Sequence, residues 1–113
     1  MPDNSQPEIR DNPDLRRYEI SVDSKLAGFA KYSVRPYRVI ITHTETFDEF
    51  EGQGLAGKLI KFALDDIRAR DLEVVPLCPF AAAYIDKHPE YDDLVDHESM
   101  AVLAREFKGP GKG

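Results

Sequence analysis

The feature that most constrains the fold is a change in the spacing of apolar residues after residue 46. Between residues 18 and 46, apolar side chains alternate with polar ones, and this period of two is typical of β-strands. Between residues 53 and 70, apolar side chains recur every three or four positions, as on one face of an amphipathic helix. The sequence therefore predicts an α/β fold in which strands precede a long helix.

Three strands are expected before the helix, at residues 18–22, 26–34 and 38–46. The segments that separate them, 23–25 and 35–37, are short and contain turn-forming residues. Such short reversals place consecutive strands side by side in opposite directions, which predicts an antiparallel meander. The third strand is rich in β-branched residues, which indicates that its first part is covered on both faces.

After the long helix, the pattern predicts a brief buried strand at 73–77 and a second helix at 80–87. Pro79 precedes this second helix at a position that suits a first helical residue. Strand, helix and strand in this order form a crossover, so strand 73–77 is expected to run parallel to, or splayed from, strand 38–46. A final amphipathic helix is predicted at 97–107.

The chain of 113 residues is long enough for one domain with a core and too short for two. Residues 1–14 are rich in Pro, Asp and Asn without an apolar period, so we expect a disordered N-terminal arm. The folded domain is expected to span residues 15–107. Residues 108–113, a glycine-rich end, are predicted to form a flexible tail.

Charge and composition argue against several classes of function. A net charge of -6 leaves no excess of lysine and arginine to neutralise nucleic-acid phosphates. No apolar run is long enough to cross a bilayer, and the N-terminus lacks the pattern of a secretory signal. Cys78 is the single cysteine, so no disulfide forms within the chain, and a reducing compartment fits best. We expect a cytoplasmic monomer that binds neither nucleic acid nor membrane.

Three glycines, Gly52, Gly54 and Gly57, lie between the meander and the long helix. Without Cβ atoms, a turn here can adopt positive φ, and its backbone can approach a ligand closely. The first amides of a helix lack internal partners and lie at the positive end of its dipole, which suits a pyrophosphate. Lys58 and Lys61 would add point charges. The same glycines are equally compatible with a flexible turn that binds nothing.

Other motifs for phosphate, metal and hydrolase sites do not occur. The GxxxxGK[ST] spacing of a Walker loop is missing. A dinucleotide fingerprint would need an acidic residue about 20 residues further on, in a second strand, and no residue here is a clear candidate for it. His43, His88 and His97 are scattered, and one cysteine does not anchor a zinc site, so no metal is expected. No GxSxG elbow indicates a serine hydrolase.

Two segments at matching spacing resemble the GNAT (Gcn5-related N-acetyltransferase) superfamily, in particular its small single-domain members with a Pro-Leu-Cys-Pro motif. The first, THTETFDEFEGQGLAGKLI, contains Glu51-Gly52-Gln53-Gly54-Leu55-Ala56 in the register of the R/Q-x-x-G-x-G/A signature. Glu51 departs from the usual Arg or Gln. The second segment is VVPLCPFAAAYIDKHPEY. The resemblance covers roughly residues 18–95 and implies a minimal GNAT-like fold.

This resemblance implies acetyl-CoA or coenzyme A as a substrate and an amine, in a small molecule or a protein, as the acceptor. The pyrophosphate would lie over the amides from Gln53 to Lys58, and the pantetheine arm would pair like an extra strand beside the end of strand 38–46. The thioester would then lie near His43, Glu45 and the residues after Leu77. The residues implied to bind the coenzyme are Thr46, Phe47, Gln53, Gly54, Leu55, Ala56, Gly57, Lys58 and Lys87.

Cys78 directly precedes Pro79 and so occupies an expected helix N-cap. The helix dipole there favours the thiolate, and a thiolate beside a thioester can take the acyl group before passing it on. Alternatively, Cys78 is a small buried residue that fills space. Cys followed by Pro is part of the motif in the resemblance, and both interpretations stay open.

His43 and Glu45 share one face of the third strand if alternation holds, together with Val39 and Ile41. A carboxylate or imidazole next to the thioester would accept a proton from the attacking amine, directly or through water. The alternatives are a half-buried histidine with satisfied hydrogen bonds and a solvated glutamate at a strand end. Together with Cys78, these two side chains are the catalytic candidates.

The leading hypothesis is an acetyl-CoA-dependent N-acyltransferase with an unidentified acceptor. The main alternative is a coenzyme-A-binding sensor or interaction module, because the short chain lacks the additional helices that build the acceptor pocket in larger members of the superfamily. A weaker third hypothesis is a thiol-based redox protein that depends on Cys78.

Overall fold

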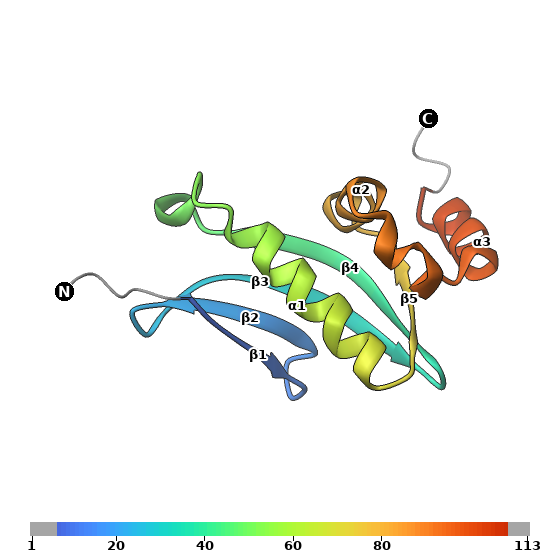
Figure 1. Cartoon of the computed structure of the whole chain (residues 1–113), viewed down its shortest axis with the longest axis horizontal. Coiled ribbons are helices and arrows are strands. Elements are labelled where there is room, and N and C mark those ends of the chain that lie inside the picture. The colour runs from blue at the N-terminus through green and yellow to red at the C-terminus, as the bar shows by residue number, and fades with distance from the viewer. Residues whose placement is uncertain (1–6, 109–113) are drawn as a thin grey trace.

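A computed structural model describes residues 7–108, with side chains described as far as Val102. It contains a five-stranded sheet in the order β1-β2-β3-β4-β5, with helix α1 lying across one face (Figure 1). β1, β2, β3 and β4 pair antiparallel with one another in turn, and β5 is parallel to β4. The elements in chain order are β1 (Glu8–Asn12), β2 (Arg17–Val22), β3 (Lys25–Arg35), β4 (Arg38–Thr46), the 3-10 helix η1 (Asp48–Phe50), α1 (Leu55–Ala69), β5 (Glu73–Pro76), α2 (Pro79–Lys87), the 3-10 helix η2 (Pro89–Leu94) and α3 (His97–Lys108).

The predicted α/β class is confirmed, but the N-terminal part of the chain differs from the prediction. The prediction of a disordered arm over residues 1–14 is wrong for Glu8–Asn12, because these residues form β1 beside β2. Ile9 is the single apolar residue of β1, so the segment shows no apolar period, yet its side chain packs against the core. The antiparallel meander therefore has four strands rather than three. The predicted disorder of residues 1–6 and 109–113 lies outside the described residues.

Helix α1 is fixed on the sheet by its apolar face. Its buried side chains are Leu55, Leu59, Ile60, Ala63, Leu64 and Ile67. They form one core with Tyr18, Ile20 and Ile41 of the sheet. The Tyr18 hydroxyl donates to Asp66 of α1 at 2.8 Å, so this buried side chain keeps its polar end satisfied. Like the other described helices, α1 does not combine the length and apolarity needed to cross a membrane.

Strands β4 and β5 are paired at one end only. Their register runs from Arg38 opposite Glu73 to Ile41 opposite Pro76, while β4 continues to Thr46. The next two N–H groups after β5, of Leu77 and Cys78, both donate to the Ile41 carbonyl at 3.0 Å. Beyond Ile41, β4 therefore has an edge that β5 does not occupy. The parallel and splayed arrangement expected from the crossover is confirmed.

A β-bulge in β4 changes the direction of the side chains that follow it. Tyr32 of β3 pairs with Ile41, whereas the preceding Lys31 pairs with His43, so Thr42 is an extra residue in β4. The Thr42 hydroxyl donates to the Lys31 carbonyl at 3.4 Å. A single extra residue shifts the alternation by one, so every later side chain of β4 points to the face opposite to the expected one.

The sheet face opposite α1 contains a buried carboxylate. Glu19 is 7% exposed and accepts hydrogen bonds from Arg10, Asn12 and Arg17 at 3.2, 3.0 and 2.8 Å. The Arg17 guanidinium also lies 4.7 Å from the centre of the Phe29 ring. Burial raises the pKa of Glu19, but the hydrogen bonds and charge of Arg17 and the bond from Asn12 outweigh burial. The pKa of Glu19 is therefore below its ordinary value.

We expect Glu19→Gln to remove a pH-dependent part of the stability. Because the pKa of Glu19 is lower in the folded than in the unfolded chain, its contribution is present above the unfolded value of 4.5. This contribution is lost as the pH falls through the folded value. Between about pH 5 and pH 3, the free energy of unfolding should fall more steeply for the wild type than for the variant. Urea unfolding across this range measures it, and parallel curves would contradict the assignment.

Candidate functional site

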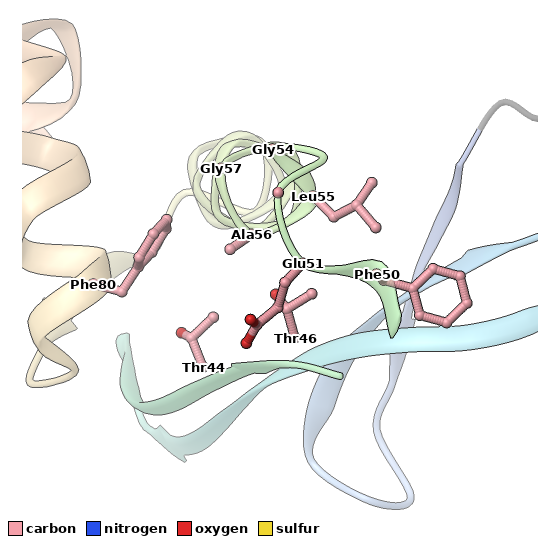
Figure 2. Close-up of a pocket in the computed structure, with 10 residues that line it drawn as sticks. Thr44, Thr46, Phe50, Glu51, Gly54, Leu55, Ala56, Gly57 and Phe80 are labelled. Atoms are coloured by element: carbon pink, nitrogen blue, oxygen red, sulfur yellow. The ribbon is translucent and has the colours of Figure 1, made fainter. Parts of the chain in front are cut away.

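A cavity of about 400 Å³ lies between the end of β4, the turn before α1 and the first turns of α1 and α2 (Figure 2). It is bounded by a strand, a glycine-rich turn and two helix starts. The residues that line it are Thr44, Thr46, Phe50, Glu51, Gly52, Gly54, Leu55, Ala56, Gly57 and Phe80. Since α2 follows β5, the cavity occupies the region where β4 and β5 have separated.

The first turn of α1 presents backbone donors to this cavity. Gly54 is the N-cap, in the left-handed region with φ 73°, and no side chain caps the helix. The N–H of Lys58 donates to the Gly54 carbonyl at 3.4 Å and so begins the helical pattern. The N–H groups of Leu55, Ala56 and Gly57 precede that bond and have no partner within the helix. Three amides at the positive end of a helix dipole can bind an anion.

Gly57 is also the point at which α1 and α2 approach each other. A Cβ atom at Gly57 would lie 3.8 Å from the Tyr84 ring of α2. The Tyr84 ring is itself stacked on His88 with 3.9 Å between ring centres. Burial raises the pKa of Tyr84, and the opposing charge of Lys61 does not reverse the shift, so the phenol stays neutral near pH 7.

The opposite wall of the cavity is polar. Figure 2 shows the side chains of Thr44 and Thr46 directed from β4 toward α1, with the Glu51 carboxylate directed into the same space. Glu51 is the position at which this chain departs from the usual Arg or Gln of the signature. A carboxylate on the rim of an anion site opposes anion binding, so Glu51 weakens the attraction that the helix amides provide.

Cys78 lies directly behind this polar wall. Its thiol donates a hydrogen bond to the Thr44 hydroxyl, with an Sγ–Oγ1 distance of 3.3 Å, and its side chain is 4% exposed. It is the N-cap of α2, followed by Pro79 as expected, although its side chain makes no capping hydrogen bond. The thiol therefore contacts a side chain of the cavity wall, although Cys78 itself does not line the cavity.

His43 and Glu45 lie on the other face of the sheet. Their side chains are 3.3 Å apart, and His43 lies 6.1 Å from the Phe29 ring, on the side of the buried Glu19. The expectation that they share a face with Val39 and Ile41 is wrong, because the bulge at Thr42 reverses the alternation. The structure therefore brings Cys78 close to the cavity but does not bring these two candidates there.

The residues implied to bind the coenzyme divide into two groups. The structure brings together at the cavity Thr46, Gly54, Leu55, Ala56 and Gly57. The others do not line it: Gln53 is exposed in the turn, Phe47 packs 6.0 Å from Phe29, Lys58 lines a separate groove with Lys61 and Phe62, and Lys87 is exposed in the last turn of α2.

Sequence reasoning missed four side chains that line the cavity: Thr44, Phe50, Glu51 and Phe80. Thr44 is missed because the register after a bulge cannot be read from alternation. Phe80 directly follows Pro79 at the start of a helix, and this position is the signal that could have placed it near Cys78. Among the described residues, no group of three or more His, Cys, Asp or Glu side chains is placed to hold a metal ion.

Comparisons with known proteins identify the family. Residues 17–94, from β2 to η2, match the family described as GCN5-related N-acetyl-transferase. The solution structure of a GCN5-like protein from Staphylococcus aureus is similar, with 28% identity and a TM-score of 0.61, over 78% of this chain and 86% of that one.

A second solved structure shares the fold. It is the ribosomal-protein-S18-alanine N-acetyltransferase of Escherichia coli, with 19% identity and a TM-score of 0.51, over 54% of this chain and 41% of that one. No curated protein sequence gave a significant match. Since the family match spans well over half of the chain, the protein belongs to the GCN5-related N-acetyltransferases.

Proposed function

We propose that the protein is an acetyl-CoA-dependent N-acyltransferase that binds the coenzyme pyrophosphate at the first turn of α1. One observation carries this proposal: the amides of Leu55, Ala56 and Gly57 have no helical partner and border the cavity between β4 and α2. The left-handed Gly54 directs the chain into the helix so that these amides stay accessible. Membership of the family supplies the reaction class, transfer of an acetyl group to an amine.

The pantetheine arm is proposed to lie along the free edge of β4. Beyond Ile41, no strand among the described residues lies beside this edge, and an unpaired strand edge offers donors and acceptors to an added extended chain. The two amides of pantetheine can pair there as a short strand would. Thr44 and Thr46 line the cavity along this edge, so their side chains would contact the arm.

This placement brings the thioester close to Cys78. In the covalent route, Sγ attacks the thioester carbonyl, an Sγ–C bond forms, the C–S bond to the coenzyme breaks, and the thiol proton passes to the leaving thiolate. The acceptor amine then attacks the acyl-Cys78 carbonyl and releases the thiol. In the direct route, Cys78 only lines the thioester site. The hydrogen bond from Cys78 to Thr44, which lines the cavity, supports a position of the thiol near the proposed thioester site.

Intact mass after incubation with acetyl-CoA separates the two routes and tests the function. An acetyl adduct that is present in the wild type and lost in Cys78→Ala supports the covalent route. Cys78→Ser is the matched control, because it replaces the thiol by a hydroxyl that can still donate to Thr44. Turnover of amine acceptors by Cys78→Ala at the wild-type rate supports the direct route. Calorimetric binding of coenzyme A without acetylation of any amine in a broad panel identifies a binding module instead of an enzyme.

Glu51→Gln is expected to tighten coenzyme binding. The Glu51 carboxylate lines the cavity near the proposed phosphate site, so removing its charge removes a repulsion without changing the size of the side chain. We expect the dissociation constant for coenzyme A to fall about two- to fivefold at low salt, with the difference reduced at high salt. Calorimetry at two salt concentrations measures it. Weaker binding by Glu51→Gln would place the phosphates elsewhere.

A further inference from the structure

The sheet has a face that the described helices leave largely uncovered. α1 contacts all five strands, α2 contacts β4 and β5, and α3 contacts β5. Ile40 and Val75 are paired in the register of β4 and β5, and both are buried, but neither belongs to the core under α1. They therefore lie on the opposite face of the sheet, and α3, which contacts β5, covers that face at the β5 end. On that opposite face, no described helix makes extensive contact with β1, β2 or β3. We call this surface of β1 to β4 the open face.

Cations lie opposite one another on the open face. The register pairs Arg17 of β2 with Lys31 of β3. Farther along β3, at its hairpin with β4, Arg35 pairs with Arg38. Like charges directly opposite each other destabilise a pair of strands by some tenths of a kcal/mol or more. Lys31 and Arg35 therefore gain nothing from these neighbours within the sheet, whereas Arg17 is paired with Glu19.

Two of these cations have no counter-ion among the described residues. Arg17 pairs with Glu19 at 2.8 Å, and Arg38 lies 3.9 Å from a carboxylate at the start of α3. Lys31 and Arg35 are exposed, and neither forms an ion pair with any side chain described between residues 7 and 102. The Arg35 guanidinium donates only to a neighbouring backbone carbonyl, at 3.3 Å. Both charges are thus available to a partner.

A cavity of about 380 Å³ adjoins this hairpin end. It is lined by Arg35 and Arg38, together with Glu98, Ser99 and Val102 of α3. The Nε of Arg38 is buried and has no hydrogen-bond partner among the described residues. Arg35 and Arg38 line the cavity from β3 and β4, so an acceptor oxygen bound there would lie beside two arginine side chains. The single acidic side chain among these lining residues, Glu98, lies on the α3 side.

The spacing of the free cations fits an extended peptide. Lys31 and Arg35 are four residues apart on β3 and alternate to the same face, so their Cα atoms are separated by about 13 Å. Carboxylates at positions i and i+4 of an extended segment have the same separation. Arg17, opposite Lys31, is bound by Glu19 at 2.8 Å and lies over the Phe29 ring, so it is not one of the free cations.

We propose that the open face binds an acidic, extended segment of a protein partner, with carboxylates against Lys31 and Arg35 and an acceptor oxygen in the cavity beside Arg38. This inference goes beyond the proposed acyl transfer and does not rest on it. The face favours a peptide over a nucleic acid because the Arg17 guanidinium covers the Phe29 ring, which a base would need for stacking.

Fluorescence anisotropy tests the proposal with a labelled peptide of alternating glutamate and threonine. The matched peptide has glutamine in place of each glutamate. We expect the glutamate peptide to bind and the glutamine peptide not to bind, and the double variant Lys31→Glu with Arg35→Glu to lose at least about tenfold in affinity. The control variant, Lys58→Glu with Lys87→Glu, makes the same change in net charge on α1 and α2 and should bind as the wild type does.

Circular dichroism and thermal unfolding establish that both double variants are folded. Equal loss of binding in both would show a general charge effect and overturn the proposal, as would equal binding of the two peptides by the wild type. Tighter binding of a single-stranded oligonucleotide than of the glutamate peptide would assign the open face to nucleic acid. If the wild type sediments as a dimer and the Lys31→Glu with Arg35→Glu variant sediments as a monomer, the open face binds a second copy of the chain. Either the nucleic-acid result or the dimer result rejects the peptide partner.

Discussion

Gly54→Val is expected to abolish measurable binding of acetyl-CoA while the protein stays folded. Gly54 adopts φ 73°, a conformation that a β-branched residue avoids, and apart from its chain neighbours no described residue has an atom within 4 Å of a Cβ built there. Valine would therefore relax toward negative φ and rotate the first amides of α1 away from the cavity. Losing several hydrogen bonds from backbone amides to a charged phosphate should weaken binding about a hundredfold or more in calorimetry.

Gly54→Asn is the matched control for this variant. Asparagine adopts the left-handed conformation more readily than other non-glycine residues, and the open space around Gly54 accommodates its side chain. We expect Gly54→Asn to keep the turn and to bind within about tenfold of the wild type. If Gly54→Val binds acetyl-CoA as tightly as the wild type does, the coenzyme does not depend on this turn.

Gly28→Ala is expected to have the largest effect on stability. Gly28 is buried in β3 opposite Thr46, and a Cβ there would overlap the backbone carbonyl oxygen of Glu45 in β4. A backbone atom cannot move aside as a flexible side chain can, so β3 and β4 must separate. We expect the free energy of unfolding to fall by about 3 kcal/mol, with a decrease in Tm on the order of 10 °C or more.

Gly57→Ala separates this clash from the general effect of adding a methyl group. A Cβ at Gly57 meets the Tyr84 ring at 3.8 Å, which is an ordinary contact, and alanine favours a helix more than glycine by about 1 kcal/mol. Thermal unfolding of the two variants side by side should show a large loss for Gly28→Ala and no loss for Gly57→Ala. Comparable Tm values would mean that the two strands tolerate a side chain at Gly28.

The secondary structure could be predicted from sequence where periodicity was strong. The apolar spacing of α1 and the alternation in β2 and β3 gave bounds close to those observed, because these elements bury one continuous face. The crossover rule similarly placed β5 beside β4. β1 was missed because it contributes one apolar side chain, Ile9, and is held mainly by pairing with β2. Strand pairing leaves little trace in a sequence.

The site was predictable in its backbone and not in its side chains. The glycines before α1 marked the exposed amides, since positive φ at Gly54 and the free helix start follow from the residue types. The face of β4 that lines the cavity could not be predicted, because the bulge residue Thr42 is itself β-branched and does not interrupt the β-branched pattern of the strand. Because of this one extra residue, the side chain of Thr44 faces the cavity and that of His43 faces the other side of the sheet.

Amide chemical-shift changes on titration with acetyl-CoA, followed by two-dimensional NMR of the ¹⁵N-labelled protein, test the account most directly. If the first turn of α1 binds the pyrophosphate, the largest changes fall on the N–H groups of Leu55, Ala56 and Gly57, with smaller changes along β4 near Thr44. An unchanged spectrum at saturating acetyl-CoA, or changes confined to residues away from that turn, would contradict it.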